Sequence, residues 1–183
     1  MAFKNDPIIN IIKEYRLLWA QHSEWTQMVI NGLVLQTPNT DAQVKRLLKN
    51  PFDLGKALEV FYGPEQGAQF ATLLTEHLQI AAKLVTATAS GDKSAVRQLT
   101  EEFFQNGNEI ALFLGSGINP FWGYQEWKEM FFTHLSIVQE LIRTMVAQEY
   151  EENNDVYDYY EAEIMEMADE MSNGIIRQFY CCH

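Results

Sequence analysis

The chain has 183 residues, of which 47% are hydrophobic and 21% charged, and its formal net charge is −12. This length and composition predict one globular domain over residues 1–183, able to bury a core without disulfides or a structural metal. The acidic charge excludes nucleic acid as a partner, because binding a polyanion normally needs a basic surface. It also disfavours an anionic membrane surface, and no apolar stretch approaches the ~20 residues that span a bilayer.

The termini indicate where the protein works. No hydrophobic signal segment follows Met1. The only cysteines, Cys181 and Cys182, are adjacent at the C-terminal end. Their spacing gives neither a disulfide framework nor a zinc-binding motif. We therefore expect a cytoplasmic protein.

Helix-capping and helix-breaking residues divide the chain into predicted helices. Asp6-Pro7 places a capping residue before a proline at the first helical position, and Asn119-Pro120 repeats the pattern. Asp92 is a third predicted cap, and Gly63-Pro64 separates a short helix from a long one. In chain order, the expected ranges are 7–35, 41–48, a short helix after Asn50-Pro51 to about 62, 64–90, 92–114, 120–150, and 153 to between 174 and 179.

The spacing of apolar residues predicts the fold class. In every long segment these residues recur at intervals of three and four, the period of a helix with one buried face. No run of alternating β-branched residues indicates a strand. We expect an all-α, up-and-down bundle of about five long helices, with two short helices bridging the first two long ones.

Each long predicted helix has one polar residue within its apolar stripe, close to the middle of the helix. In an up-and-down bundle of similar-length helices, these midpoints meet at one level. The sequence therefore predicts a polar layer of three imidazoles, one amide and one carboxylate inside an apolar core. Its members are His22, His77, Asn106, His134 and Glu161.

A metal site is one interpretation of this layer. Imidazole and carboxylate groups are ligands for Zn, Fe, Mn, Ni or Cu, and bundle cores are a common place for such sites. We expect His22, His77, His134 and Glu161 to bind the ion, with Asn106 outside them. Three histidines and one carboxylate would leave a coordination position open, which is the pattern of catalytic sites. The sequence identifies neither a substrate nor a reaction.

Two alternatives stay open. The layer fits equally a buried hydrogen-bond network that specifies helix packing, in a non-enzymatic interaction or regulatory protein. A third interpretation is a carrier of apolar small molecules that uses the tryptophans and methionines, although aromatic residues at helical spacing usually belong to the core.

Several segments combine these polar residues with aromatic and apolar ones: Trp19-x-x-His22-x-x-Trp25-Thr26, Arg46-Leu47-Leu48-Lys49-Asn50-Pro51, His77-Leu78-x-Ile80-Ala81, Asn106-x-x-Glu109-Ile110-Ala111, Asn119-Pro120-x-Trp122, His134-Leu135, and Met167-Ala168-Asp169 ahead of Gly174-Ile175-Ile176. Together they resemble a family of small all-helical proteins from spore-forming Gram-positive bacteria. The resemblance covers nearly the whole chain. It implies the helical fold and no particular ligand. Gly107 departs from the alanine expected there.

Members of that family often carry the name acetylglutamate kinase. Amino-acid kinases of that type are larger α/β proteins with glycine-rich phosphate-binding loops. This sequence has neither the strands nor such a loop, since Gly115-Ser116-Gly117 follows no strand and precedes no phosphate-binding lysine. We expect no kinase activity.

Overall fold

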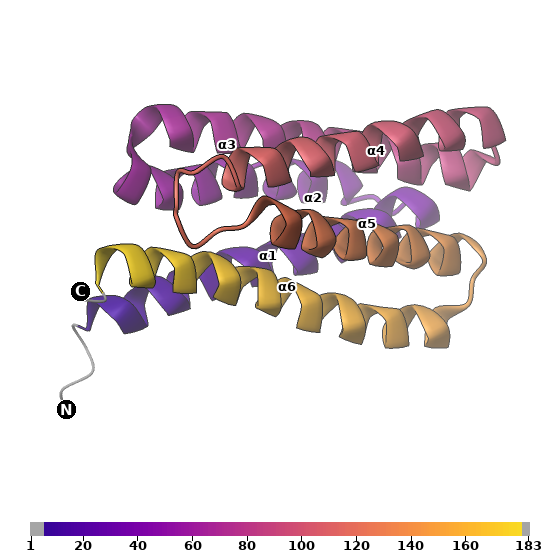
Figure 1. Cartoon of the computed structure of the whole chain (residues 1–183). Coiled ribbons are helices and arrows are strands. Elements are labelled where there is room, and N and C mark those ends of the chain that lie inside the picture. The colour runs from indigo at the N-terminus through magenta and orange to yellow at the C-terminus, as the bar shows by residue number, and fades with distance from the viewer. Residues whose placement is uncertain (1–5, 181–183) are drawn as a thin grey trace.

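A computed structural model of the protein describes residues 6–180, which form six helices joined by short connections (Figure 1). No strand occurs among these residues, so the predicted all-α bundle is confirmed. The helices are α1 (Pro7–Leu35), α2 (Thr40–Leu47), α3 (Asn50–Ser90), α4 (Lys93–Leu114), α5 (Tyr124–Val146) and α6 (Tyr150–Phe179).

Helix α3 consists of two segments that meet at Gly63. This residue has φ 84° and ψ 168°, a backbone conformation that favours glycine, and Pro64 follows it. The short first segment folds back on the long second one, and the two backbones meet closely at Gly55 and Gly67. A Cβ atom on either glycine would lie 2.5 Å from the carbonyl oxygen of the other. With α2, the first segment supplies the two predicted short helices.

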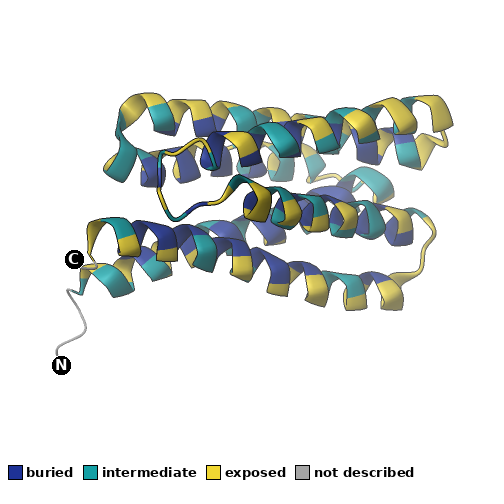
Figure 2. Ribbon diagram, viewed as in Figure 1, coloured by how far each residue is buried: buried dark blue, intermediate teal, exposed yellow. Residues whose placement is uncertain are grey.

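The helices enclose one main hydrophobic core. α1 packs against α2, α3 and α6, α4 packs against α3 and α5, and α5 packs against α6. Figure 2 shows the buried faces of the helices turned inward and the exposed faces outward. Large fully buried side chains such as Trp19, Phe70, Trp127 and Tyr160 fill the interior. Within the described range, none of the helices combines the length and apolar character needed to cross a membrane.

Two predicted helix caps are confirmed. The Asp6 side chain accepts a hydrogen bond from the Ile8 backbone N–H, and Pro7 begins α1. Asp92 accepts hydrogen bonds from the backbone N–H groups of Ser94 and Ala95 at the start of α4. Each carboxylate satisfies N–H groups that have no partner within the helix.

The predicted helix start at Asn119 is wrong, because α5 begins at Tyr124. Asn119 instead organises the preceding turn: its Oδ1 accepts from the Phe121 backbone N–H, and its Nδ2 donates to the Tyr62 hydroxyl. Trp122, in the same turn, packs directly on Gly174 of α6, where a Cβ atom would lie 2.0 Å from the indole nitrogen. Long-range contacts therefore hold this segment outside the helix.

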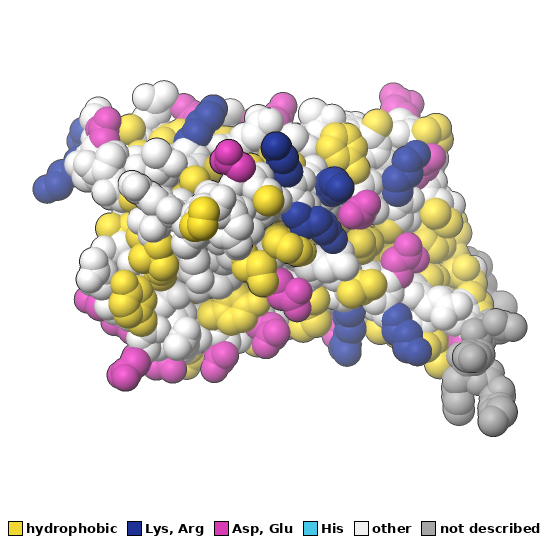
Figure 3. Space-filling view, turned by 180° about the vertical axis from the view of Figure 1, so that it is seen from behind, with side chains coloured by type: hydrophobic (Ala, Val, Ile, Leu, Met, Phe, Trp, Pro, Cys, Tyr) yellow, Lys and Arg dark blue, Asp and Glu magenta, His cyan; other side chains and the backbone are white. Residues whose placement is uncertain are grey.

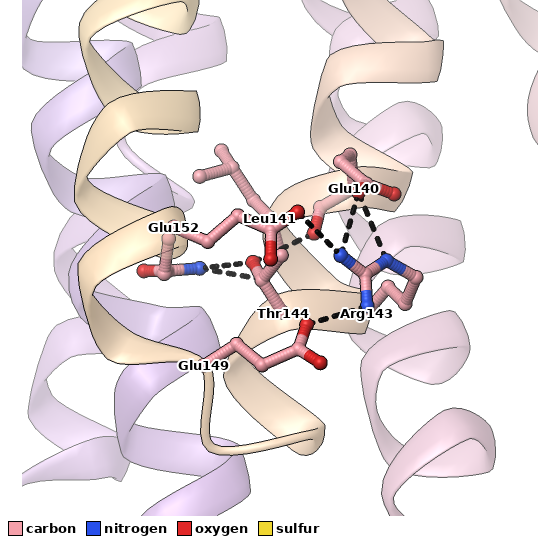
Figure 4. Close-up of polar contacts among 7 residues, drawn as sticks. Glu140, Leu141, Arg143, Thr144, Glu149 and Glu152 are labelled. Atoms are coloured by element: carbon pink, nitrogen blue, oxygen red, sulfur yellow. Dashed lines mark hydrogen bonds and ion pairs between the residues drawn. The ribbon is translucent and has the colours of Figure 1, made fainter.

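The predicted boundary between the last two helices is also wrong. α5 ends at Val146, and α6 begins at Tyr150, so Asn153 lies inside the first turn of α6. Asn153 is buried and donates to the Leu141 carbonyl and the Thr144 hydroxyl, both on α5. Figure 4 shows this turn.

An exposed ion-pair cluster covers the outside of the same turn. The Arg143 guanidinium contacts the carboxylates of Glu140, Glu149 and Glu152 (Figure 4). Because all four side chains are close to half exposed, each pair stabilises the turn only weakly.

Candidate functional site

Three histidines meet in the interior of the bundle. His22 of α1, His77 of α3 and His134 of α5 are only 2%, 2% and 1% exposed. The ring centroid of His134 lies 5.8 Å from that of His22 and 5.9 Å from that of His77. The structure thus brings together the three imidazoles that the sequence places on separate helices at a common height.

Each imidazole makes its Nδ1 contact with an oxygen atom on another helix or helical segment. The His22 Nδ1 lies 3.1 Å from Asn50 Oδ1, and the His77 Nδ1 lies 2.9 Å from Asn106 Oδ1. The His134 Nδ1 lies 3.0 Å from Glu163 Oε2. In sequence, the partner follows its histidine by 28, 29 and 29 positions. The site is therefore built from three similar contacts.

The two asparagines determine which imidazole nitrogen carries the proton. Asn50 Nδ2 donates to the Leu18 carbonyl, 2.8 Å away. Because a carbonyl can only accept, this contact orients the carboxamide with its oxygen towards His22. The His22 Nδ1 must then carry the hydrogen, and its Nε2 presents a lone pair.

The contact between Asn106 and His77 repeats this arrangement. Asn106 Nδ2 donates to the Leu73 carbonyl, 3.2 Å away. In both pairs the carbonyl lies four residues before the histidine. His77 therefore has the same tautomer as His22, with an Nε2 lone pair.

Glu163 takes the place of an asparagine at the third histidine. It is 8% exposed, and its Oε2 accepts from the His134 Nδ1–H. The second carboxylate oxygen, Oε1, is buried and has no hydrogen-bond partner among residues 6–180. The contact between His134 and Glu163 is the one ion pair of the site, charged on both sides when His134 is protonated.

The predicted carboxylate, Glu161, is not part of the site. Its side chain is exposed, whereas Glu163 is buried on the core face of α6. Two positions correspond to about 200° of rotation around a helix, so the two glutamates face nearly opposite directions. The later part of the apolar stripe predicted for this helix is buried, at Ile164, Ala168, Met171 and Ile175. Its first two members, Tyr157 and Glu161, are wrong, because Tyr160 and Glu163 occupy the buried face there.

The sequence analysis assigns Asn50 no place in the site, because Asn50-Pro51 indicates only the end of a short helix. It is fully buried and is the first residue of α3. One signal was present in the sequence: Asn50 follows His22 at nearly the spacing at which Asn106 follows His77.

Burial keeps two of the rings neutral. Desolvation lowers the pKa of His22 to about 3, with a further contribution from a charge on His134. Desolvation also lowers the pKa of His77 well below its ordinary value, and charges on His134 and His22 act in the same direction. At neutral pH both imidazoles are therefore uncharged, which is the form that binds metals.

Aromatic rings surround the histidines. Phe103 stacks on His77 with a centroid distance of 4.7 Å, and Tyr160 lies 5.3 Å from His134. Trp19 meets His22 edge-on at 5.6 Å. Trp19, Trp122 and Trp127 all lie in the packed core. The surroundings of the site are thus apolar, and this low polarity strengthens electrostatic interactions within the site.

Each of the three histidine contacts uses Nδ1, and no hydrogen bond found among residues 6–180 uses an Nε2 atom. An Nε2 lone pair can bind a cation, or accept a hydrogen bond from a protonated ring or a water molecule. Within residues 6–180, no group of three or more His, Cys, Asp or Glu side chains lies so that it could hold a metal ion.

All three histidines within residues 6–180 are buried, so the described surface carries no histidine cluster. On the face shown in Figure 3, both basic and acidic side chains are present. Comparison with protein-family models, curated proteins and solved structures found no match to this chain. Interpretation of the site therefore depends on its own geometry.

Proposed function

We propose that the protein binds one transition-metal ion, of Zn, Fe, Mn, Ni or Cu, at the centre of the bundle through the Nε2 atoms of His22, His77 and His134. The observation that supports this most is that an oxygen from another helical segment engages every Nδ1. In metal sites, ligating histidines almost always donate their second ring N–H to a carboxylate or a carbonyl oxygen, which fixes the tautomer and the ring orientation.

Ring spacing also supports the proposal. Three Nε2 ligands at about 2.0–2.1 Å from a tetrahedral ion would place ring centroids roughly 5 Å apart. The separations here are 5.8 and 5.9 Å. In these two pairs, both of which include His134, binding an ion would require the rings to approach each other by less than about 1 Å.

In this proposal, Glu163 replaces Glu161 as the carboxylate of the site, but it does not bind the ion. Its carboxylate holds the Nδ1 side of His134, which faces away from an ion at Nε2. The ion then has three neutral protein ligands and an open coordination position, as in catalytic sites. A metal-dependent protein acting on or carrying a small molecule is the function class that follows.

Elemental analysis of protein purified without a histidine tag tests the proposal. We expect about one metal ion per chain, and we expect His77→Ala to abolish this stoichiometric binding. Asn153→Ala is the matched control, since it removes another buried polar side chain from a different part of the core. The control variant should lose stability and keep its metal.

The second candidate is a packing network without metal. It is favoured by the finding that, within the described range, no group of three or more His, Cys, Asp or Glu side chains lies so that it could hold a metal ion. Here a protonated His134, paired with Glu163, would donate its Nε2–H to a neighbouring ring. His77→Ala would then destabilise the fold by about 1–3 kcal/mol. Wild-type protein that neither contains nor takes up Zn(II), Fe(II) or Co(II) would decide for this candidate.

A further inference from the structure

A small cavity lies in the core of the bundle, close to the three histidines. Residues of α1, α2, α3 and α5 line it, and its volume is about 20 Å³. Three of its wall residues, on α1, α3 and α5, each follow one of the histidines by four positions: Thr26, Ala81 and Val138. Four residues make about one helical turn. The cavity is therefore the next level of the bundle beyond the imidazoles.

The wall of the cavity is apolar. Among the described residues that line it, every side chain except that of Thr26 is a hydrocarbon. All of these residues are buried apart from Ala81 and Ala82 of α3, which are half-buried. They belong to helices, so nearly all of their backbone N–H and C=O groups are engaged in helix hydrogen bonds. The Thr26 hydroxyl is thus the one polar side-chain group in this wall.

The composition of the wall disfavours water as the occupant. A buried water molecule typically makes about three hydrogen bonds, and cavities lined by hydrocarbon stay dry. This wall offers at most one side-chain partner, the Thr26 hydroxyl, which makes no hydrogen bond to any residue in the range 6–180. An empty space deprives the surrounding side chains of part of their dispersion contacts. An apolar occupant restores these contacts and needs no polar partner.

We propose that this cavity binds one small apolar molecule, of the size of dioxygen. Its volume sets the size of the ligand, since about 10–15 Å³ holds one water-sized probe and a cavity that binds benzene has about 150 Å³. At about 20 Å³, the site takes roughly one or two heavy atoms and excludes aromatic ligands. It differs from the apolar carrier that the sequence allows, because none of the described residues in its wall is a tryptophan or a methionine.

Xenon is a suitable probe, because it is a single apolar atom that binds in dry cavities. In methyl NMR spectra of the wild-type protein, we expect xenon to shift the resonances of Leu78, Val138 and Ile142 with saturation. Those of Ile164 and Ile175, which lie in the core away from the cavity, should stay in place. Dissolved dioxygen is paramagnetic and should broaden the same three sets of methyl resonances.

A matched pair of variants tests the location. Val138→Ile adds a methyl group to the wall and should lower the affinity for xenon by about tenfold or more, because the cavity cannot hold both. Val96→Ile adds the same group on α4, at a partly buried position outside the wall, and should stay within about twofold of wild type. Ile142→Val removes a methyl group from the wall and should bind xenon at least as tightly as wild type, which keeps the test available if Val138→Ile does not fold.

Three results would overturn the proposal. Xenon shifts that do not saturate would show that no site exists, and equal xenon affinity in Val138→Ile and Val96→Ile would place the site elsewhere. Nuclear Overhauser contacts between a long-lived water molecule and the Val138 methyl groups would show a hydrated cavity. None of these measurements needs a metal ion, so failure here would leave the proposed function standing, and protein without metal would leave this site standing.

Discussion

At the scale of single residues, Asn50, Asn106 and Glu163 each orient one histidine, two through an amide and one through a carboxylate. Each presents an oxygen to the Nδ1 of a histidine, but the asparagines are held by a second hydrogen bond to a backbone carbonyl. Glu163 has no such second bond, and its Oε1 stays unpaired within residues 6–180. His134 is therefore held by charge, and the other two histidines by neutral amides.

Replacing Glu163 tests this role against a control on the same helix. Glu163→Ala leaves the buried Nδ1–H of His134 without a partner, so it should lower the free energy of unfolding by about 1–3 kcal/mol. If the metal site exists, metal affinity should fall by roughly 10–100-fold. Glu161→Ala changes an exposed side chain and should alter stability by less than about 0.5 kcal/mol. Urea unfolding and metal titration measure both effects; equal behaviour of the two variants would contradict this role for Glu163.

The depressed pKa values of His22 and His77 predict how stability depends on pH in metal-free protein. Both rings stay neutral in the folded state, and the pKa of His22 falls to about 3. The unfolded chain takes up their protons near pH ~6.5. Their contribution to the free energy of unfolding is therefore complete above pH ~6.5 and is lost as the pH falls from there towards about 3.

Between pH ~7.5 and ~5.5, we expect these two histidines to lower the free energy of unfolding by about 2–3 kcal/mol. Urea unfolding at the two pH values measures the change. His22→Gln should reduce the pH-dependent loss by roughly half, because one of the two buried rings is gone. A loss of the same size in this variant would mean that other groups cause it.

Much of the site could be predicted from the sequence, because helical periodicity and height place His22, His77, His134 and Asn106 on core faces. The prediction of the fifth member, Glu161, is wrong. At the start of α6, Tyr157 and Glu161 lie at a helical spacing, as do Tyr160 and Glu163, so period alone does not decide which of these two pairs is buried. Only packing against α1 and α5 decides which stripe is buried.

At the scale of the helices, local chemistry predicts where a helix begins only when the capping residue has no stronger partner elsewhere. Asp6 and Asp92 cap as expected. Asparagine is a favoured capping residue, but the side chains of Asn119 and Asn153 form hydrogen bonds elsewhere. Asn119 donates to the Tyr62 hydroxyl, and Asn153 donates to the Leu141 carbonyl. These partners lie on other helices, so a local reading of the chain could not reveal them.

The close approach within α3 gives a prediction at this scale. Gly67→Ala would put a methyl group 2.5 Å from the Gly55 carbonyl oxygen, and backbone atoms there cannot move aside without separating the two segments. We expect a loss of about 1–3 kcal/mol in the free energy of unfolding, the usual effect of overpacking. Gly123→Ala is the control, since its nearest neighbour would be 3.7 Å away. Thermal unfolding compares them; a neutral Gly67→Ala would show that the segments can separate without loss.

At the scale of the whole molecule, the histidine layer connects helices that are distant in sequence. Its three contacts link α1 with α3, α3 with α4, and α5 with α6, while ring contacts link His134 of α5 with His22 and His77. The apolar core continues through the same helices independently of the layer. An ion at the centre would therefore tighten a bundle that is already folded.

This arrangement predicts what removal of the metal does. Since the apolar core stays in place, a chelator should leave the helical circular dichroism at room temperature unchanged while lowering the melting temperature. An ion present at about 100 times its dissociation constant stabilises the native state by about 2.7 kcal/mol, which corresponds to roughly 5–10 °C for a chain of this size. In His77→Ala, which lacks one ligand, the chelator should change nothing. Unfolding of the wild-type protein by the chelator at room temperature would mean that the ion is required for the fold, and an unchanged melting temperature would mean that no ion binds the folded state.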